Sequence, residues 1–166
     1  MKYPILFSLM LTTLLICACK SSTSEYEKST DGSITWISID QAATLRNTEE
    51  KLYFVDVYTE WCGWCKVMDK KTFTDPEVIT RMSDNFHMVK FDAEQTDLVH
   101  WEGQEYIYRA GGRKGIHGLA PYLLNNRLSY PSFAILDKDR NPIKTIVGYK
   151  DPAQLIAEIS KITATN

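Results

Sequence analysis

The feature that most restricts the fold is an apolar run that leads into a pair of closely spaced cysteines. Residues 52–58 read LYFVDVY, almost continuously apolar and rich in β-branched and aromatic side chains, with one charge at Asp56. Such a run is typical of a strand that is buried on both faces of a sheet. The segment WCGWCK (residues 61–66) follows at once, and a helix is expected to begin near Cys62. A buried strand that leads into a helix indicates a layered α/β domain.

The remaining pattern predicts alternating strands and helices from about residue 34. Strands are expected at 33–39, 52–58, 87–91, 132–136 and 143–148, and helices from 38 or 40 to about Glu50, from 62, from 74 and from 151 to 162. Thr74 and Glu77 have the spacing of a capping box. Residues 94–118 are expected to be irregular, with a helical turn within 116–124. The short turn at 137–141 can join the last two strands only in antiparallel fashion, so the sheet is predicted to be mixed.

A Cys-x-x-Cys pair has three common uses: haem attachment, half of a zinc site, or a redox dithiol. Haem attachment requires a histidine directly after the second cysteine, where this chain has Lys66. A structural zinc site needs a second pair of ligands, and the three histidines of the chain are scattered, at His87, His100 and His117. The redox dithiol is therefore the leading interpretation, with metal binding and an inert structural disulfide as alternatives. No metal and no organic cofactor is expected.

The position of the pair at a helix start supports redox chemistry. Unpaired N–H groups and the positive end of the helix dipole lower the pKa of a cysteine placed there. The spacing puts the second sulfur one turn further into the helix, close enough to attack a mixed disulfide. Cys62 is accordingly expected to be the exposed nucleophile, and Cys65 the buried resolving thiol.

Four separated features resemble the thioredoxin fold. They are Asp56 six residues before Cys62, Trp61 directly before Cys62, Lys90 in the strand 87–91, and the pair Tyr130-Pro131. WCGWCK together with TFTDPEV (residues 72–78) most resembles the extracytoplasmic branch that includes the C-terminal domain of DsbD. The resemblance covers residues 34–162 and implies a three-layer sandwich with a mixed central sheet flanked by helices. The segment of about 94–128 would be an insertion before a cis-proline.

The resemblance also implies roles for individual residues. Asp56 would relay a proton to or from Cys65, the alternative being a structural pair with Lys90. Pro131 would be cis and would expose the backbone of Tyr130 to a substrate strand, the alternative being an ordinary loop proline.

Trp61, Gly63 and Trp64 would form a surface for substrate around the sulfurs, although core packing is an equal alternative for both tryptophans. The aromatic side chains of the insertion would either shape a groove for substrate or only pack against the rest of the domain. Trp64 stands where thioredoxin has proline and many isomerases and oxidases have histidine, a departure that makes a strong oxidant less expected.

The N-terminus is interpreted as an export signal. Lys2 precedes an uncharged run of 16 residues from Tyr3 to Ala18, which is somewhat short for a membrane-spanning helix of about 20 residues. The segment Ile16-Cys17-Ala18-Cys19 resembles a bacterial lipobox with lipid attached at Cys19. We therefore expect a signal peptide over 1–18, a polar tether over 19–33 and a domain over 34–166. An uncleaved membrane anchor is the alternative.

These expectations together predict an extracytoplasmic, membrane-tethered thiol–disulfide oxidoreductase that reduces or isomerises disulfides in exported proteins. Its partners would be those proteins, an upstream thiol–disulfide electron donor, and the membrane through the lipid. The net charge of −2 gives no reason to expect nucleic acid, since nucleic-acid binders need a basic stripe or patch. The alternative from another class is a binding module, or a metal-handling protein that uses the same cysteine pair.

Overall fold

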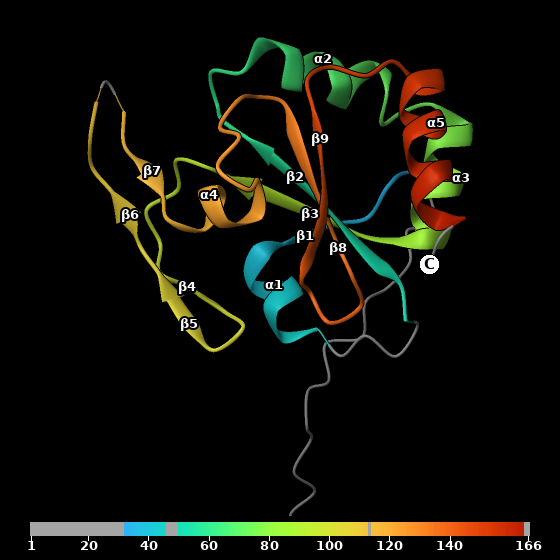
Figure 1. The fold of residues 1–166 in the computed structure, drawn as a ribbon. Helices are drawn as coiled ribbons and strands as arrows, with labels where there is room; N and C mark the ends of the chain where they lie inside the picture. Colours follow the sequence, from blue (N-terminus) through green and yellow to red (C-terminus); the bar gives the residue numbers. More distant parts are fainter. Residues whose placement is uncertain (1–31, 46–49, 113, 165–166) are drawn as a thin grey trace, which may run out of the picture.

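A central sheet of five strands organises the molecule (Figure 1). The computed structural model describes residues 32–45, 50–112 and 114–164. The strands lie in the order β1 (Trp36–Ser38), β3 (Phe86–Asp92), β2 (Leu52–Tyr58), β8 (Ser132–Leu136) and β9 (Pro142–Val147). β1, β3 and β2 are parallel, whereas β8 runs antiparallel to β2 and β9 antiparallel to β8. The predicted mixed sheet is confirmed.

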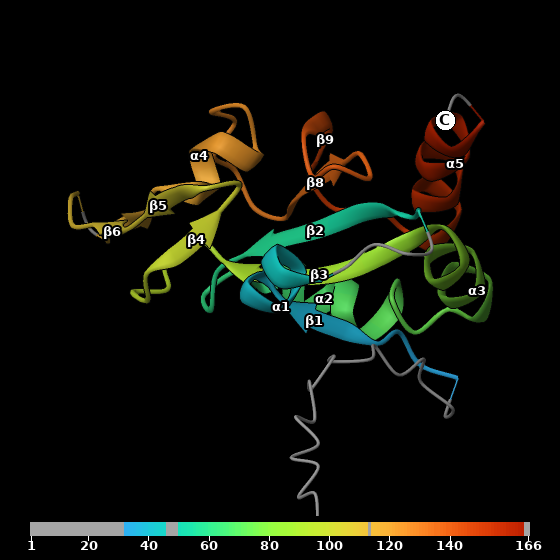
Figure 2. The same ribbon diagram turned by 90° about the horizontal axis from the view of Figure 1, so that it is seen from below.

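Helices cover both faces of this sheet and make a sandwich of three layers. One face packs against α1 (Ile39–Thr44) and α4 (Leu119–Leu123), and the other against α2 (Gly63–Lys71), α3 (Pro76–Asn85) and α5 (Pro152–Thr163). Figures 1 and 2 both show α3 and α5 side by side near one end of the sheet. The predicted α/β sandwich is therefore confirmed.

The alternation of side chains along β2 produces two separate cores. Tyr53, Val55 and Val57 belong to the core beneath α1 and α4, while Phe54 belongs to the core beneath α2, α3 and α5. Neighbouring side chains of a strand point to opposite faces, so Asp56 lies on the same face as Phe54. This register places the one charge of the strand on the side of the sheet that α2 covers.

Two helix ends differ from the sequence-based expectations. Ser38 is the N-cap of α1 and forms a capping box with Gln41, but the helix ends at Thr44 because Leu45 is extended, rather than continuing to Glu50. The N-cap of α3 is Asp75, whose Oδ1 accepts hydrogen bonds from the backbone N–H groups of residues 77 and 78, and not Thr74. A carboxylate adds a favourable charge at the positive helix end, which a threonine hydroxyl does not.

The insertion is more regular than its sequence suggests. It forms two small hairpins, from β4 (Val99–Trp101) with β5 (Gln104–Tyr106) and from β6 (Tyr108–Arg109) with β7 (Ile116–His117), followed by α4. Both views show these hairpins extending to one side of the sheet (Figures 1 and 2). Val99 and Trp101 are fully buried in the core beneath α1 and α4, so this part of the insertion belongs to the domain core.

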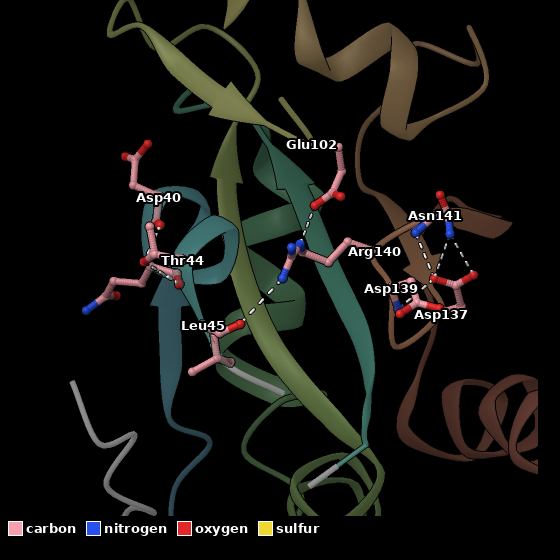
Figure 3. Close-up of polar contacts among 9 residues, drawn as sticks. Asp40, Thr44, Leu45, Glu102, Asp137, Asp139, Arg140 and Asn141 are labelled. Atoms are coloured by element: carbon pink, nitrogen blue, oxygen red, sulfur yellow. Dashed lines mark hydrogen bonds and ion pairs between the residues drawn. The ribbon is translucent and has the colours of Figure 1, made fainter. Parts of the chain in front are cut away.

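Arg140 ties the first hairpin to the rest of the domain (Figure 3). It lies in the turn between β8 and β9, and its guanidinium pairs with Glu102 in the β4–β5 turn. A second guanidinium nitrogen donates to the carbonyl oxygen of Leu45, at 3.4 Å, where α1 has ended. One side chain thus joins three segments that are distant in sequence.

His117 anchors the second hairpin. Its backbone N–H donates to the Ala93 carbonyl at 2.7 Å, just beyond the end of β3. Its buried ring accepts a hydrogen bond from the N–H of Leu119 at Nδ1, so the proton lies on Nε2, 3.0 Å from the Asp97 carbonyl oxygen. Burial lowers the pKa of His117 and keeps this ring neutral. The base of β6 and β7 is therefore fixed to the strand that carries Lys90.

Candidate active site

The two cysteines lie where β2 leads into α2. Cys62 is the N-cap of α2, and its Sγ accepts a hydrogen bond from the N–H of Cys65 at 3.1 Å. The two sulfurs are joined as a disulfide, with a sulfur–sulfur distance of 1.98 Å and 5.3 Å between the Cα atoms. In the reduced protein the same N–H and the helix dipole would stabilise a thiolate at Cys62.

Exposure does not distinguish the two cysteines. Both have a relative solvent accessibility of 4% in the disulfide form, so the expectation that Cys62 is the exposed member is wrong for this state. In this state the Cys62 sulfur is bonded to Cys65 and accepts the Cys65 N–H, so it lies against the first turn of α2 rather than pointing outward. What distinguishes the cysteines is their place on the helix: Cys62 at its N-cap and Cys65 inside its first turn.

Two exposed tryptophans flank the disulfide in sequence. Trp61 is 58% exposed and Trp64 is 60% exposed, so neither is a core residue. The Trp61 ring meets Tyr130 edge to face at 6.1 Å between centroids, and the Trp64 ring lies 5.1 Å from Tyr149. Between them, a Cβ added at Gly63 would meet no heavy atom within 4 Å. Two aromatic pairs thus border the site, with an unobstructed position between the two tryptophans.

The segment between α4 and β8 contributes the next part of the site. The Tyr130–Pro131 peptide bond is cis, as expected. Pro131 accepts a hydrogen bond at its carbonyl oxygen from the N–H of Gly148 at 2.8 Å, which joins this segment to the end of β9. Burial, with the charges of Glu94 and Asp92, raises the pKa of Tyr130 to about 12. Its phenol is therefore neutral at physiological pH.

Asp56 and Lys90 form a pair beneath α2. The Lys90 Nζ lies 2.6 Å from Asp56 Oδ2 and 2.5 Å from Oδ1 of Asp69, a residue of α2. The same ammonium lies 4.6 Å from the centre of the Trp36 ring. One lysine thus joins β2, β3 and α2, so the structural pairing of Asp56 with Lys90 is present.

The environment of Asp56 also suits proton transfer. Burial raises the pKa of Asp56 to about 6 in spite of the opposing charge of Lys90, in the expected direction. Its second oxygen, Oδ1, is buried and accepts no hydrogen bond from any described residue. Although burial works to lower it, attraction by the two carboxylates raises the pKa of Lys90. Asp56 can therefore gain or lose a proton near neutrality while Lys90 remains charged.

The sequence-based reasoning missed two residues. Asp69 follows Cys65 by four positions, so both lie on one side of α2, and this i, i+4 spacing was the available signal. Glu94 accepts a hydrogen bond from the Trp61 indole N–H at 2.7 Å, and no local pattern in the sequence signals it. Cys19, the predicted lipid site, lies outside the described residues.

Two further features of the described residues concern metal binding and membrane crossing. No three or more His, Cys, Asp or Glu side chains among them are grouped so that they could hold a metal ion. Within the same ranges, no helix has both the length and the apolar character needed to cross a membrane.

Sequence comparisons connect this arrangement to known proteins. Residues 18–146 match the family profile Thioredox_DsbH, described as a protein of unknown function, DUF255. The thiol:disulfide interchange protein DsbD of Tatumella citrea is 27% identical over 127 residues, which cover 75% of this chain and 19% of that protein. DsbD of Haemophilus ducreyi is 31% identical over 74 residues, covering 38% of this chain and 13% of that protein. The chain spans less than a fifth of either relative.

Solved structures share the fold. A thioredoxin from Thermus thermophilus superposes with a TM-score of 0.57 at 18% identity, covering 79% of this chain and 88% of that one. A putative disulphide-isomerase from Bacteroides thetaiotaomicron gives 0.54 at 23% identity, covering 77% and 89%. A structure described as DsbH oxidoreductase gives 0.54 at 15% identity, covering 81% and 89%. The sandwich described above is therefore the thioredoxin fold.

Proposed function

The chain belongs to the Thioredox_DsbH family, and we propose that it is a thiol–disulfide oxidoreductase that reduces or isomerises disulfides of exported proteins. The observation that carries the proposal is the Cys62–Cys65 disulfide at the start of α2 on a thioredoxin fold. The DsbD-like relatives are named for thiol–disulfide interchange. The site supplies a nucleophile, a resolving thiol and a titratable carboxylate.

The proposed reaction begins with the reduced protein. The Cys62 thiolate attacks one sulfur of a substrate disulfide, which forms a mixed disulfide and releases the other substrate sulfur as a thiolate. Cys65 loses its proton and attacks the Cys62 sulfur, which closes the 62–65 disulfide and releases the reduced substrate. Two electrons pass from the protein to the substrate. A dithiol donor then returns the protein to its reduced form.

Thiol labelling during turnover tests the proposed function. The reduced protein, mixed with a disulfide-bonded protein such as insulin, is expected to reduce it and to end with Cys62 joined to Cys65. One cysteine, Cys62, should react with an alkylating reagent at a pH well below about 8.5, the usual pKa of a free thiol. A protein that transfers no electrons, or whose cysteines react only after treatment with a chelator, would contradict the proposal and indicate a metal-handling module.

We also propose that the protein acts outside the cytoplasm and is held at a membrane. The support is the sequence of residues 1–33, which has the pattern of a signal peptide, a lipidated Cys19 and a polar tether. Its partners would then be exported proteins and an upstream thiol–disulfide electron donor. Two or more acyl chains would suffice for stable anchoring.

Mass spectrometry of the mature N-terminus tests the lipid anchor. The protein purified from membranes is expected to begin at Cys19 and to carry the added mass of acyl chains. Cys19→Ser should abolish that modification, while Cys17→Ser, the matched control within the signal peptide, should leave it intact. An unmodified Cys19, or cleavage at another position, would contradict the assignment.

A further inference from the structure

The insertion reaches the dithiol site through Glu94, which lies two residues beyond the end of β3. The two oxygens of this carboxylate have different partners: Oε1 accepts from the Trp61 indole N–H at 2.7 Å, and Oε2 lies 3.3 Å from the Lys114 ammonium. Its side chain is 19% exposed. Glu94 therefore connects the tryptophan before Cys62 with a residue of the β6–β7 loop.

The loop that carries Lys114 folds closely against β6 at the neighbouring Gly115. The Gly115 N–H donates to the Tyr108 hydroxyl at 2.9 Å. A Cβ added at Gly115 would come within 2.4 Å of the Arg109 carbonyl oxygen and 2.3 Å of that hydroxyl. Only glycine allows so close an approach, so the loop is folded tightly against β6. In Figure 1 this hairpin rises along the left side of the molecule, toward the end at which α2 lies.

Lys114 also opposes the negative charge around Asp92, at the end of β3. Burial and the carboxylates of Glu60 and Glu94 raise the pKa of Asp92, and the hydrogen bond from the Glu94 N–H and the charge of Lys114 oppose them. The Lys114 ammonium lies 5.9 Å from the centre of the Trp61 ring, at the outer limit of a cation–π contact. Lys114, a residue of the insertion, thus interacts both with the carboxylates around Asp92 and with the Trp61 ring.

The Trp61 ring is held on two sides. Its N–H donates a hydrogen bond to Glu94, and the ring meets Tyr130 edge to face, with an angle of 81° between the ring planes. More than half of its surface remains exposed. A fixed ring with a free surface binds apolar groups at a lower entropic cost than a mobile ring does.

We propose that Lys114 and Glu94 make the insertion a specificity element of the dithiol site. Lys114 holds Glu94, Glu94 holds Trp61 against Tyr130, and this fixed aromatic edge selects substrates that have an apolar side chain beside their disulfide. The inference rests on the proposed oxidoreductase function. Glu94 and Lys114 are positioning residues that act through Trp61.

The test compares three disulfides: a disulfide-bonded peptide with phenylalanine next to its cysteine, the same peptide with serine there, and oxidised glutathione. The wild-type protein is expected to prefer the phenylalanine peptide through a lower KM. Lys114→Ala should raise that KM about threefold, because a partly exposed ion pair contributes little. Glu94→Ala should raise it about tenfold, because a charge-assisted hydrogen bond is lost. The kcat with oxidised glutathione should stay within about twofold of wild type.

Two controls keep the outcomes separate. Lys138→Ala removes a lysine of the β8–β9 turn that has the same exposure, 56%, and pairs with Glu50, and it should change no KM. Glu94→Gln keeps an acceptor for the indole and should behave like Lys114→Ala, which provides a reading if Glu94→Ala does not fold. The indole N–H resonance of Trp61, assigned with Trp61→Phe, should move in Glu94→Ala.

The proposal is overturned if Glu94→Ala retains the peptide preference, or if all three substrates lose activity in parallel, which would indicate a purely structural role. A wild-type protein that reduces none of the three disulfides would instead refute the proposed oxidoreductase function.

Discussion

Replacing Cys65 by serine is expected to trap the protein on its substrates as mixed disulfides through Cys62. The Cys62 sulfur accepts the N–H of residue 65 at the start of α2, so the thiolate that attacks first forms there. Without Cys65 nothing within the protein can attack the mixed disulfide. Catalytic turnover should fall by about a thousandfold or more, as it does when a residue that makes or breaks the reacting bond is removed.

The matched variant is Cys62→Ser, which should lose turnover to the same extent but should trap few substrates. Non-reducing electrophoresis followed by mass spectrometry measures both results. Equal trapping by the two variants would contradict the assignment of Cys62 as nucleophile. The burial of both sulfurs makes this comparison necessary, because exposure alone does not identify the attacking thiol.

The sheet could be predicted because its strands carry strong local signals. The apolar run at β2 and the short turn between β8 and β9 determine a buried central strand and an antiparallel pair. The hairpins of the insertion could not be predicted, since β6 and β7 have two residues each and such lengths show no periodicity. Their order comes from long-range contacts, such as that between Arg140 and Glu102.

The residues of the candidate site also fall into those that the sequence indicates and those that it does not. Asp56, Lys90 and Pro131 could be found because each occupies a position that resembles the thioredoxin pattern. The contacts of Asp69 with Lys90 and of Glu94 with Trp61 depend on which side chains the fold brings together across 21 and 33 positions, although the spacing of Asp69 from Cys65 was a local signal. The expectation of an exposed Cys62 was wrong for this state because its sulfur is bonded to Cys65 and accepts the Cys65 N–H.

Asp56→Asn is expected to make the domain more stable at neutral pH. Burial raises the folded-state pKa of Asp56 to about 6 from a reference value of 3.8. For an acid whose folded pKa is raised, folding favours the protonated form, so stability is highest below the unfolded pKa and falls as the pH rises through the folded pKa. The difference of roughly two pKa units corresponds to about 3 kcal/mol above pH 6.

Asparagine removes that cost but also removes one partner of Lys90, which retains Asp69. A net gain of about 1–3 kcal/mol in the free energy of unfolding is therefore expected at pH 7, with little gain at pH 4. Urea denaturation at the two pH values measures the difference. A variant that is destabilised at pH 7 would show that the pair with Lys90 outweighs the burial of the charge.

The same substitution should slow the second chemical step. Asp56 lies on the face of the sheet that α2 covers, and α2 carries Cys65. As a carboxylate it can accept the proton that Cys65 must lose to attack the mixed disulfide. The rate of resolution in the wild type should therefore rise through about pH 6. In Asp56→Asn the rate at pH 7 should be about a hundredfold lower and should rise only as the thiol itself ionises.

Asp69→Asn provides the sharper control, because it changes the pKa of Asp56 without removing the carboxylate. The charge of Asp69 raises the pKa of Asp56, and Asp69 shares the Lys90 ammonium with Asp56. Its loss should move the rise in the resolution rate to lower pH, while the rate at pH 7 and the attack by Cys62 remain close to wild type. Stopped-flow measurement of release from a preformed mixed disulfide gives all three profiles. If the three profiles coincide, Asp56 has only a structural role, and the proton of Cys65 must leave directly to water.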